Sequence, residues 1–528
     1  MRQIGFKNFR RFENFPALDL APITIFVGEN NAGKSTVVKG ILALSDFLNS
    51  WRDDFNFLIE RHDEVKKVKK SIVEKLKNQK FYFNTSYLAH IGTFKRALYN
   101  KADGNTISFN TKLGLQELTI DVFGNKNDDE SVSGVIEKIS LNYSTFGINL
   151  EYDLQKDFAT IKFTPTYLSE DQLEYFPPRK RKNVKAFLES IPHEYVLTYK
   201  ISDYYRRFAP DLIVTLMASL EIAISATMEY ERTNKYIGAD MAVDLKPISN
   251  IDEETVSFLK QYTEIICDNP RGEKWIFRLP ESRFIRNLSG IEYIYAHAVT
   301  QTVIYSAKDT NDYLSKTIHE FASMPKTDDD YRREFIKHWM KEFNIGKDYV
   351  ITSVGGEAHI VKIKNDDEEL VNLADKGMGS IQLMVLLFRL AIRLPRRQLS
   401  KHDAKKREFL MPRMFRTIII EEPEQNLHPM LQSKLADLFY KLNEDYGYRF
   451  IIETHSEYLI RKTQVIVKNN FNDIDRSLKE NPFKVYYFNS SSKEKPYYEI
   501  EYQNDGNFSN DFGRGFFDEA SNLAFEIL

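Results

Sequence analysis

The stretch Gly28-Glu29-Asn30-Asn31-Ala32-Gly33-Lys34-Ser35-Thr36 decides the fold. It matches in full the spacing of a glycine, any four residues and then Gly-Lys-Ser/Thr. The apolar run Ile23–Val27 precedes it and predicts a buried strand. A helix is predicted after it, with one broad apolar face made by Val37, Val38, Ile41, Leu42, Leu44 and Leu48. Strand, loop and helix in this order are the setting that a phosphate-binding loop requires.

The residue types in this loop suit a triphosphate. Gly28 and Gly33 let backbone N–H groups curl around phosphate oxygens, and the helix that begins at Lys34 directs the positive end of its dipole toward them. The Lys34 ammonium reaches the β- and γ-phosphates, and the Ser35 hydroxyl is a ligand for Mg²⁺. We therefore expect this loop to bind ATP with Mg²⁺ through Gly28, Glu29, Asn30, Asn31, Ala32, Gly33, Lys34, Ser35 and Thr36.

A second apolar strand ends in acids, in the stretch Thr417–Pro423. Its order after the loop predicts that Glu421 and Glu422 lie at the carboxyl end of a buried parallel strand, where open α/β sheets bind nucleotides. Adjacent strand residues point to opposite faces, so the two carboxylates are expected to have different roles. We expect Glu421 to hold the Mg²⁺ shell through water and Glu422 to polarise the attacking water.

A third apolar strand begins at Arg449 and ends in Thr454-His455-Ser456. His455 follows Glu422 by about thirty residues, across a helix predicted over Pro429–Tyr440. This position favours a histidine that senses the γ-phosphate. The predicted catalytic residues are therefore Glu422, His455 and Lys34.

A glycine-containing helix start lies just ahead of the acidic strand. Gly377, Gly379 and Ser380 open a helix that is predicted to run to about Arg393. Backbone N–H groups at such a start can bind an anion. The position of these residues before Glu421 favours a phosphate contact over a simple turn.

The remaining sequence divides into three ranges. Residues 1–165 combine the phosphate-binding loop with period-two segments between Asn105 and Thr164, which predict an antiparallel meander. Residues 166–348 have mainly helical patterns, including Pro210–Tyr230 and Asp330–Phe343, and predict a helical insertion. Residues 349–528 return to strands and carry the acidic motifs. The predicted fold class is α/β, with a mixed-sheet core and an antiparallel lobe split by the insertion.

Composition limits the classes of function. The net charge is −3, so any DNA or RNA contact must come from a local basic patch. Cys267 is the one cysteine, which fits a reducing cytoplasm. The N-terminus lacks the apolar core of a signal peptide, and the longest apolar run, Leu212–Leu220, is too short to cross a membrane. The candidate patches are Arg179–Lys182 and a loop with Arg393, Arg396, Arg397, Lys401, Lys405, Lys406 and Arg407. The lysines from Lys66 to Lys77 are interpreted as the solvated face of a helix.

Taken together, these motifs resemble the SMC/RecF/OLD branch of ABC-type ATPases. The resemblance implies that Gly377, Gly379 and Ser380 form a signature motif that touches the γ-phosphate held by a second copy of the chain. It implies that His455 is the switch histidine and that a D-loop at the dimer seam contains Glu424, Asn426 and His428. The sequence departs from the branch in having Glu421 where aspartate is commoner and in lacking Leu-Ser-Gly-Gly-Gln.

Three functions fit this resemblance. The first is the ATPase subunit of an anti-phage system of the Septu or PARIS type, which would act with a separate nuclease or Toprim protein. The second is a RecF- or SMC-like ATPase of DNA repair or maintenance, and the third is a transporter nucleotide-binding subunit. Asp473 and Asp475 match the Asp-x-Asp pattern of a Toprim domain, but they lie in a polar turn without a partner strand. We therefore expect no intrinsic nuclease activity. We expect the chain to pair with itself, as an ATP-dependent head-to-tail homodimer or as part of a larger oligomer.

Overall fold

The computed structural model divides into two units. Unit 1 comprises Met1–Asp19 and Thr36–Ser289, and unit 2 comprises Leu20–Ser35 and Gly290–Leu528. The structure describes residues 3–59, 79–84, 90–113, 116–143, 147–173, 178–200, 253–262, 265, 291–295, 301–306, 308–309, 312–325, 331–396, 417–471, 481–490, 495–503, 505–513, 516–519, 523 and 525–526.

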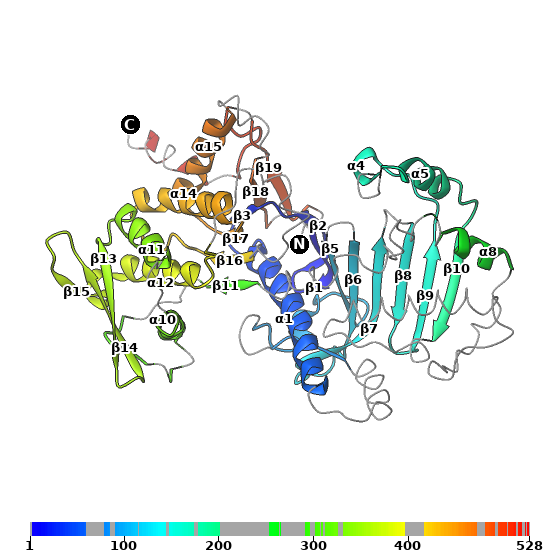
Figure 1. Ribbon diagram of the computed structural model, residues 1–528, viewed down its shortest axis with the longest axis horizontal. Helices are drawn as coiled ribbons and strands as arrows, with labels where there is room; N and C mark the ends of the chain where they lie inside the picture. Colours follow the sequence, from blue (N-terminus) through cyan, green and yellow to red (C-terminus); the bar gives the residue numbers. More distant parts are fainter. Residues whose placement is uncertain are drawn as a thin grey trace. The chain divides into compact units, whose positions relative to one another are not determined.

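Unit 1 is built on a large antiparallel sheet. Its period-two segments alternate between buried and partly exposed side chains, as in Ala159, Ile161 and Phe163 against Thr160 and Lys162. The predicted meander is confirmed. Among the described residues, nine strands form the sheet (Figure 1) in the order β10 (Tyr195–Lys200), β9 (Phe158–Phe163), β8 (Ile148–Asp153), β7 (Ser133–Tyr143), β6 (Gln116–Phe123), β5 (Thr106–Leu113), β1 (Gln3–Phe9) and β2 (Phe12–Asp19), with β4 (Lys80–Tyr82) paired to β7.

The helix after the phosphate-binding loop is α1 (Lys34–Ile59). Its first two residues belong to unit 2 and the rest to unit 1. Gly40 faces the ring of Phe6 on β1, where an added Cβ would lie 2.4 Å from a ring carbon. This close approach fixes α1 against the sheet of unit 1. The aromatic core beneath it stacks Phe81 on Phe109 at 4.8 Å between ring centroids.

Residues 166–348, predicted as a helical insertion, contain strands as well as helices. β10 extends the sheet of unit 1 because it pairs with β9 from Tyr195 to Lys200. Two further strands of this range belong to unit 2 and are too short to show a period in the sequence, β11 (Glu292–Ile294) and β12 (Tyr305–Ser306). The helices are α4 (Glu170–Leu173), α5 (Arg181–Glu189), α8 (Glu253–Tyr262), α10 (Tyr313–Ala322) and α11 (Tyr331–Glu342).

The structure therefore has strands within the range 166–348, which was predicted to be mainly helical. The stretch Pro210–Tyr230 lies outside the described residues. The three domain ranges remain a prediction. In unit 1, residues 166–348 also contribute an aromatic cluster, in which Tyr195 stacks on Phe258 of α8 with 4.0 Å between ring centroids.

A further short helix of unit 1, outside this range, is α3 (Phe94–Ala97).

Unit 2 contains the sheet on which the nucleotide motifs lie. Its described strands follow the order β11, β16 (Thr417–Glu421), β17 (Arg449–Glu453), β3 (Ile23–Gly28), β18 (Phe483–Phe488) and β19 (Tyr497–Ile500). The pairs from β11 to β18 are parallel, and β19 is antiparallel. The strands β16, β17 and β3 are almost wholly buried, as their apolar sequences predict.

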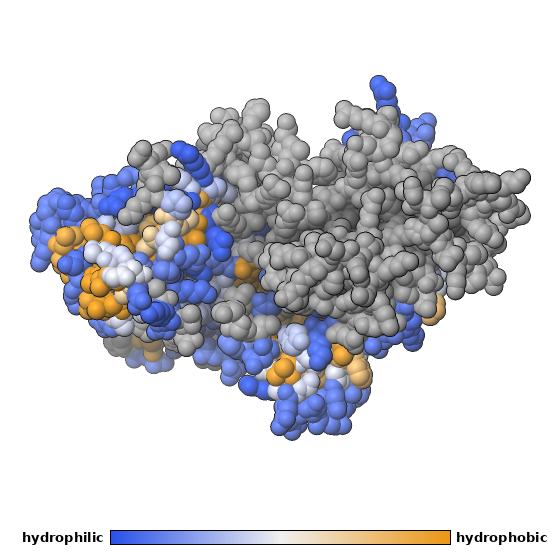
Figure 2. All heavy atoms as spheres, turned by 60° about the horizontal axis from the view of Figure 1, so that its bottom comes forward, coloured by the Kyte–Doolittle hydropathy of each residue, from blue (hydrophilic) through white to orange (hydrophobic). Residues whose placement is uncertain are grey.

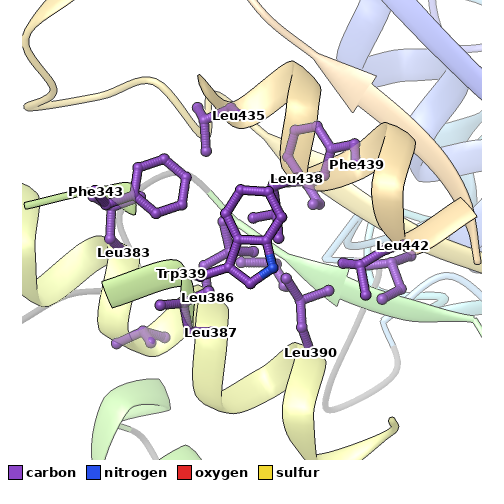
Figure 3. Packing of buried hydrophobic residues seen from close by; sticks show 14 of the residues in the cluster. Trp339, Phe343, Leu383, Leu386, Leu387, Leu390, Leu435, Leu438, Phe439 and Leu442 are labelled. Atoms are coloured by element: carbon purple, nitrogen blue, oxygen red, sulfur yellow. The ribbon is translucent and has the colours of Figure 1, made fainter. Parts of the chain in front are cut away.

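Helices pack around this sheet to form the core of unit 2. They are α12 (Met378–Ile392), which follows the 3₁₀ turn Leu373–Lys376, together with α14 (Pro429–Tyr446), α15 (Glu457–Phe471), α10 and α11. Trp339 of α11 inserts between α12 and α14, where it meets Leu386 and Leu438 (Figure 3). Because α12 is apolar on nearly all sides, its buried length anchors the glycine-containing loop at its start.

A smaller sheet of unit 2 leaves apolar residues exposed. It contains β12, β14 (Ala358–Lys364), β13 (Asp348–Val354) and β15 (Leu370–Asn372). Figure 2 shows apolar side chains in the region of this sheet, at the left of the view. Exposed apolar residues in the strands of this sheet are Val350, Val354 and Leu370, and Ile304, which directly precedes β12, is exposed as well. Among the described helices of the chain, none is long and apolar enough to cross a bilayer.

Candidate nucleotide site

The phosphate-binding loop joins β3 to α1 with the backbone that its glycines permit. Gly28 and Gly33 have φ angles of 126° and 111°, which side-chain-bearing residues rarely adopt. A Cβ at Gly28 would lie 2.2 Å from the carbonyl oxygen of Phe488 on β18. Asn31 also takes a positive φ, of 59°. The loop therefore has the tight turn that its sequence predicts, and α1 begins at Lys34.

Lys34 is buried within this turn. Its Nζ donates to the carbonyl oxygens of Gly28 and Glu29, at 2.9 Å each. Burial lowers the pKa of Lys34, and the nearby carboxylates of Glu453 and Glu422 oppose that shift. The ammonium is thus held inside the loop among carboxylates, where it can act on a bound anion.

The ends of the parallel strands bring a row of polar side chains together. Glu421 ends β16 and is the register partner of Glu453, which ends β17. Ser35 Oγ donates to Glu453 Oε1 at 2.9 Å. On the other side, Tyr293 of β11 is hydrogen-bonded to Glu421. Burial, followed by the charge of Glu421, raises the pKa of Tyr293, so its phenol stays protonated and donates.

Glu453 is the buried member of this row. It is 6% exposed, and its Oε2 has no hydrogen-bond partner among the described residues. Burial, followed by the charge of Glu421, raises the pKa of Glu453 to about 7. A buried carboxylate oxygen without a donor is costly unless a proton or a cation meets it.

The row fits a divalent cation chemically. Ser35 offers a hydroxyl oxygen, and Glu421 and Glu453 offer carboxylate oxygens, which are the hard ligands that Mg²⁺ prefers. The orphaned Oε2 of Glu453 is an acceptor that such an ion would satisfy. Among the described residues, no three His, Cys, Asp or Glu groups form a complete metal cage.

Glu422 lies just beyond the strand in an unusual backbone conformation. Its φ is 45°, although it is not a glycine, and its N–H donates to the carbonyl oxygen of Glu453 at 2.7 Å. Gln425 Nε2 donates to Glu422 Oε2. A left-handed non-glycine residue costs about 1 to 3 kcal/mol and is typical of functional sites.

The predicted switch histidine sits on a loop tied to the predicted D-loop. Glu424 is buried, and its Oε1 accepts the backbone N–H of His455 at 2.7 Å. Thr454 N–H donates to the carbonyl oxygen of Phe26 on β3 at 3.1 Å. Burial lowers the pKa of His455, and the Lys34 charge lowers it further, so the imidazole is neutral near pH 7.

The glycine-containing loop packs against the same D-loop segment. Gly377 has a φ of 86° and precedes α12 without a side-chain cap. A Cβ on Gly379 would lie 2.5 Å from the carbonyl oxygen of Asn426. Gln382 links the two segments, because its Oε1 accepts from Asn426 Nδ2 at 3.3 Å and its Nε2 faces the carbonyl oxygen of Glu422 at 3.4 Å. The other predicted D-loop residue, His428, caps α14.

The structure thus places most predicted site residues together within unit 2. The loop Gly28–Ser35 and the residues Glu421, Glu422, Glu424 and His455 meet through the contacts above. Ser380 lies on the first turn of α12, directly after Gly379, which packs against the D-loop segment. Thr36 is the first residue of unit 1 in α1.

Sequence reasoning missed Glu453, Tyr293 and the link through Gln382. Glu453 stands directly before Thr454 at the end of an apolar strand, the same position as Glu421, and this was the signal that could have found it. Tyr293 lies in a strand of three residues that has no periodic signature. Of the basic segments, Lys66–Lys77 and the loop residues from Arg397 to Arg407 lie outside the described residues, as do Asp473 and Asp475.

A phosphate-binding loop before a helix, with strand-end acids beside it, defines a P-loop nucleotide site in a mixed α/β fold. A family model described as an AAA ATPase domain matches residues 1–460. The chain therefore belongs to the AAA ATPase domain family. The predicted mixed α/β fold with a large antiparallel sheet is confirmed.

Solved structures of SMC head domains are similar to the chain. The Smc head domain of Pyrococcus furiosus with an extended coiled coil, bound to the C-terminal domain of ScpA, has a TM-score of 0.31 and 10% identity, over 100% of this chain and 98% of that chain. The SMC head domain from Thermotoga maritima has a TM-score of 0.32 and 10% identity, over 95% and 100%. A SmcHead bound to the C-winged helix domain of ScpA has a TM-score of 0.28 and 10% identity, over 95% and 97%. No curated protein matches the chain.

Proposed function

We propose that the chain hydrolyses ATP with Mg²⁺ at the site in unit 2. The observation that carries this proposal is the row Ser35, Glu453 and Glu421, with Lys34 and Glu422 beside it. A bound Mg²⁺ would neutralise charge on the phosphates and orient them. Membership of the AAA ATPase domain family supports the same activity.

In this proposal, different residues of the chain bind the phosphates, hold the metal ion and accept the proton of the attacking water. Lys34 leaves the carbonyl oxygens of Gly28 and Glu29 and donates to the β- and γ-phosphates. Ser35 and Glu421 would hold the Mg²⁺ ion, which would supply positive charge next to the phosphates. Glu422 accepts a proton from the attacking water, and the neutral His455 lies on the loop that faces the γ-phosphate.

Lys34→Ala tests this function. The substitution removes a charge-assisted contact to the phosphates, so both ATP binding and turnover should be lost. Binding is measured by isothermal titration with ATP and Mg²⁺, and turnover by phosphate release. Lys39→Ala, which changes a lysine further along α1, serves as the matched control and should keep both. Wild-type turnover by Lys34→Ala would contradict the assignment of the loop.

We also propose that the site is completed by a second copy of the chain. The support is the resemblance of Gly377, Gly379 and Ser380 to a signature motif that acts in trans. A helix start with free N–H groups can cap the exposed side of a γ-phosphate. ATP would then hold two copies head to tail with two-fold symmetry, as a homodimer or as part of a larger assembly.

For the cellular role, we propose an ATPase subunit that controls a separate nuclease or Toprim effector in cytoplasmic anti-phage defence. The support is the resemblance to Septu- and PARIS-type ATPases. A RecF- or SMC-like role on DNA is the alternative, in which basic residues such as Arg179–Lys182 contact nucleic acid. Co-purification of a nuclease and protection of cells from phage, both lost in Lys34→Ala, would support the defence role. ATP-dependent DNA binding without protection would support the alternative.

A further inference from the structure

The strand ends of unit 2 hold a carboxylate to which neither the motifs nor the resemblance gives a role. Glu453 is 6% exposed, yet only one of its oxygens has a donor among the described residues, the Ser35 hydroxyl. Its register partner is Glu421, which carries a second carboxylate. Two carboxylates on adjacent strands, one of them buried, repel each other unless a proton or a cation lies between them.

The distance between Ser35 and Glu453 fits a shared metal ion. Oxygens in neighbouring positions of an octahedral Mg²⁺ shell, each about 2.1 Å from the ion, are about 3.0 Å apart. Ser35 Oγ and Glu453 Oε1 are 2.9 Å apart. The pair therefore already has the spacing of two neighbouring ligands, and the hydrogen bond between them holds that spacing.

The charged and polar groups near Glu453 are hydrogen-bonded to other partners than its Oε2 atom. The positive charge of Lys34 acts on Glu453, but the Lys34 Nζ is engaged with the carbonyl oxygens of Gly28 and Glu29. Tyr293 donates to Glu421, so the charge of Glu421 is already partly compensated from β11. Glu453 Oε2 thus remains the carboxylate oxygen in the row that still lacks a partner among the described residues.

We propose that Glu453 is a direct ligand of the Mg²⁺ that binds with ATP, next to Ser35, with Glu421 acting through water and held by Tyr293. This inference rests on the proposed function, since it concerns the same site. It assigns the site a second protein ligand and explains why a carboxylate is kept buried at the end of β17.

The test measures metal-dependent nucleotide binding, without turnover. A fluorescent ATP analogue with a non-hydrolysable β–γ bridge is titrated in EDTA and at rising Mg²⁺ concentration. Glu453→Gln keeps the shape and an acceptor for Ser35 but loses the charge. The Mg²⁺ concentration at half-maximal binding should rise by about tenfold or more, while binding in EDTA stays unchanged.

A metal-preference switch separates a direct ligand from a hydrogen-bond acceptor. Glu453→Cys replaces a hard oxygen with a soft thiolate, so Cd²⁺ should restore tight analogue binding that Mg²⁺ does not. Wild-type protein with Cd²⁺ controls for Cys267. Glu457→Gln controls for charge, because this glutamate follows on α15 and pairs with Arg461 at 3.2 Å. Its Mg²⁺ dependence should match that of wild type.

The outcomes separate the two proposals. If wild-type protein shows no Mg²⁺-dependent binding, the proposed function fails and this inference falls with it. If wild type depends on Mg²⁺ but Glu453→Gln and Glu453→Cys behave like wild type, the function stands and the role of Glu453 is overturned. Should Glu453→Gln fail to fold, as shown by its melting curve, Glu453→Cys with Cd²⁺ still decides the question.

Discussion

At the scale of single residues, Glu422 is the clearest test of chemistry. Its positive φ and its contact with Gln425 hold the carboxylate in one place. Glu422→Gln preserves that shape but cannot accept a proton, so turnover should fall by about 10² to 10⁴ while ATP still binds. Phosphate release and analogue binding measure the two effects separately. Wild-type turnover would show that the roles of Glu421 and Glu422 have been exchanged.

The raised pKa of Glu453 predicts how stability depends on pH without metal. Its pKa is about 7 in the folded protein, against an ordinary 4.5. Between these values the folded protein keeps a proton that the unfolded chain releases. This contribution to stability is therefore complete below the ordinary value and is lost as pH rises through about 7.

Glu453→Gln is always neutral and lacks this loss. Its free energy of unfolding relative to wild type should increase by roughly 1 kcal/mol per pH unit from about pH 5 to about pH 7, and then level off. Chemical denaturation in EDTA at several pH values measures the difference. A difference that stays constant with pH would show that Glu453 titrates in its ordinary range.

Site residues that belong to a local sequence motif could be predicted from the sequence. Site residues that depend on contacts between distant parts of the chain could not. Lys34 and Ser35 follow from the loop pattern, and Glu421 and His455 follow from apolar strands that end in polar residues. The role of Tyr293 depends on β11 pairing with β16, a contact between residues far apart in the sequence. Gln382 meets Asn426 for the same reason. No local pattern encodes such contacts.

At the scale of elements, a buried ion-pair network ties α12 to the nucleotide-binding sheet. Arg389 of α12 contacts Glu292 of β11 at 2.7 Å, and both side chains are 10% exposed. It also contacts Glu320 of α10 at 2.5 Å. Arg393 reaches Glu292 at 3.4 Å, so this predicted basic residue is engaged within the unit. Glu292 is the neighbour of Tyr293, so β11 contacts α12 through one residue and Glu421 through the next.

Arg389→Met should destabilise unit 2 strongly. The substitution keeps apolar length but leaves Glu292 as a buried charge without its main partner, which typically costs about 3 to 5 kcal/mol. Lys308→Met is the matched control, because its pair with Glu357 is exposed and should contribute at most about 1 kcal/mol. Chemical denaturation measures both. Equal effects of the two substitutions would contradict the network.

Elements with a strong period were predicted well, and short ones were not. The meander from β5 to β9 alternates along its length, and α11 and α14 have apolar stripes, so their types followed from the sequence. β10 lies within a region of helical patterns, and β11 and β12 have three and two residues. Such strands are defined by their partners in a sheet rather than by their own residues.

At the scale of the whole molecule, the central claim is that ATP joins two copies of this AAA-family chain at shared sites. One copy would supply Lys34 and Ser35, and the other would supply Gly379 and Ser380. Ser380→Arg places a bulky cation at the start of α12, so it should spare ATP binding by a single copy but abolish ATP-induced pairing and turnover. Lys34→Ala should be inactive through loss of binding.

Mixing these two inactive variants tests the claim most directly. A mixed dimer has one site with both defects and one site with neither, because the intact loop comes from the Ser380→Arg copy and the intact signature from the Lys34→Ala copy. Phosphate release should therefore return on mixing, up to about half of the wild-type rate per mixed dimer if the sites act independently. If mixed dimers form, as shown by differently tagged copies, and no phosphate is released, the site is not shared between copies.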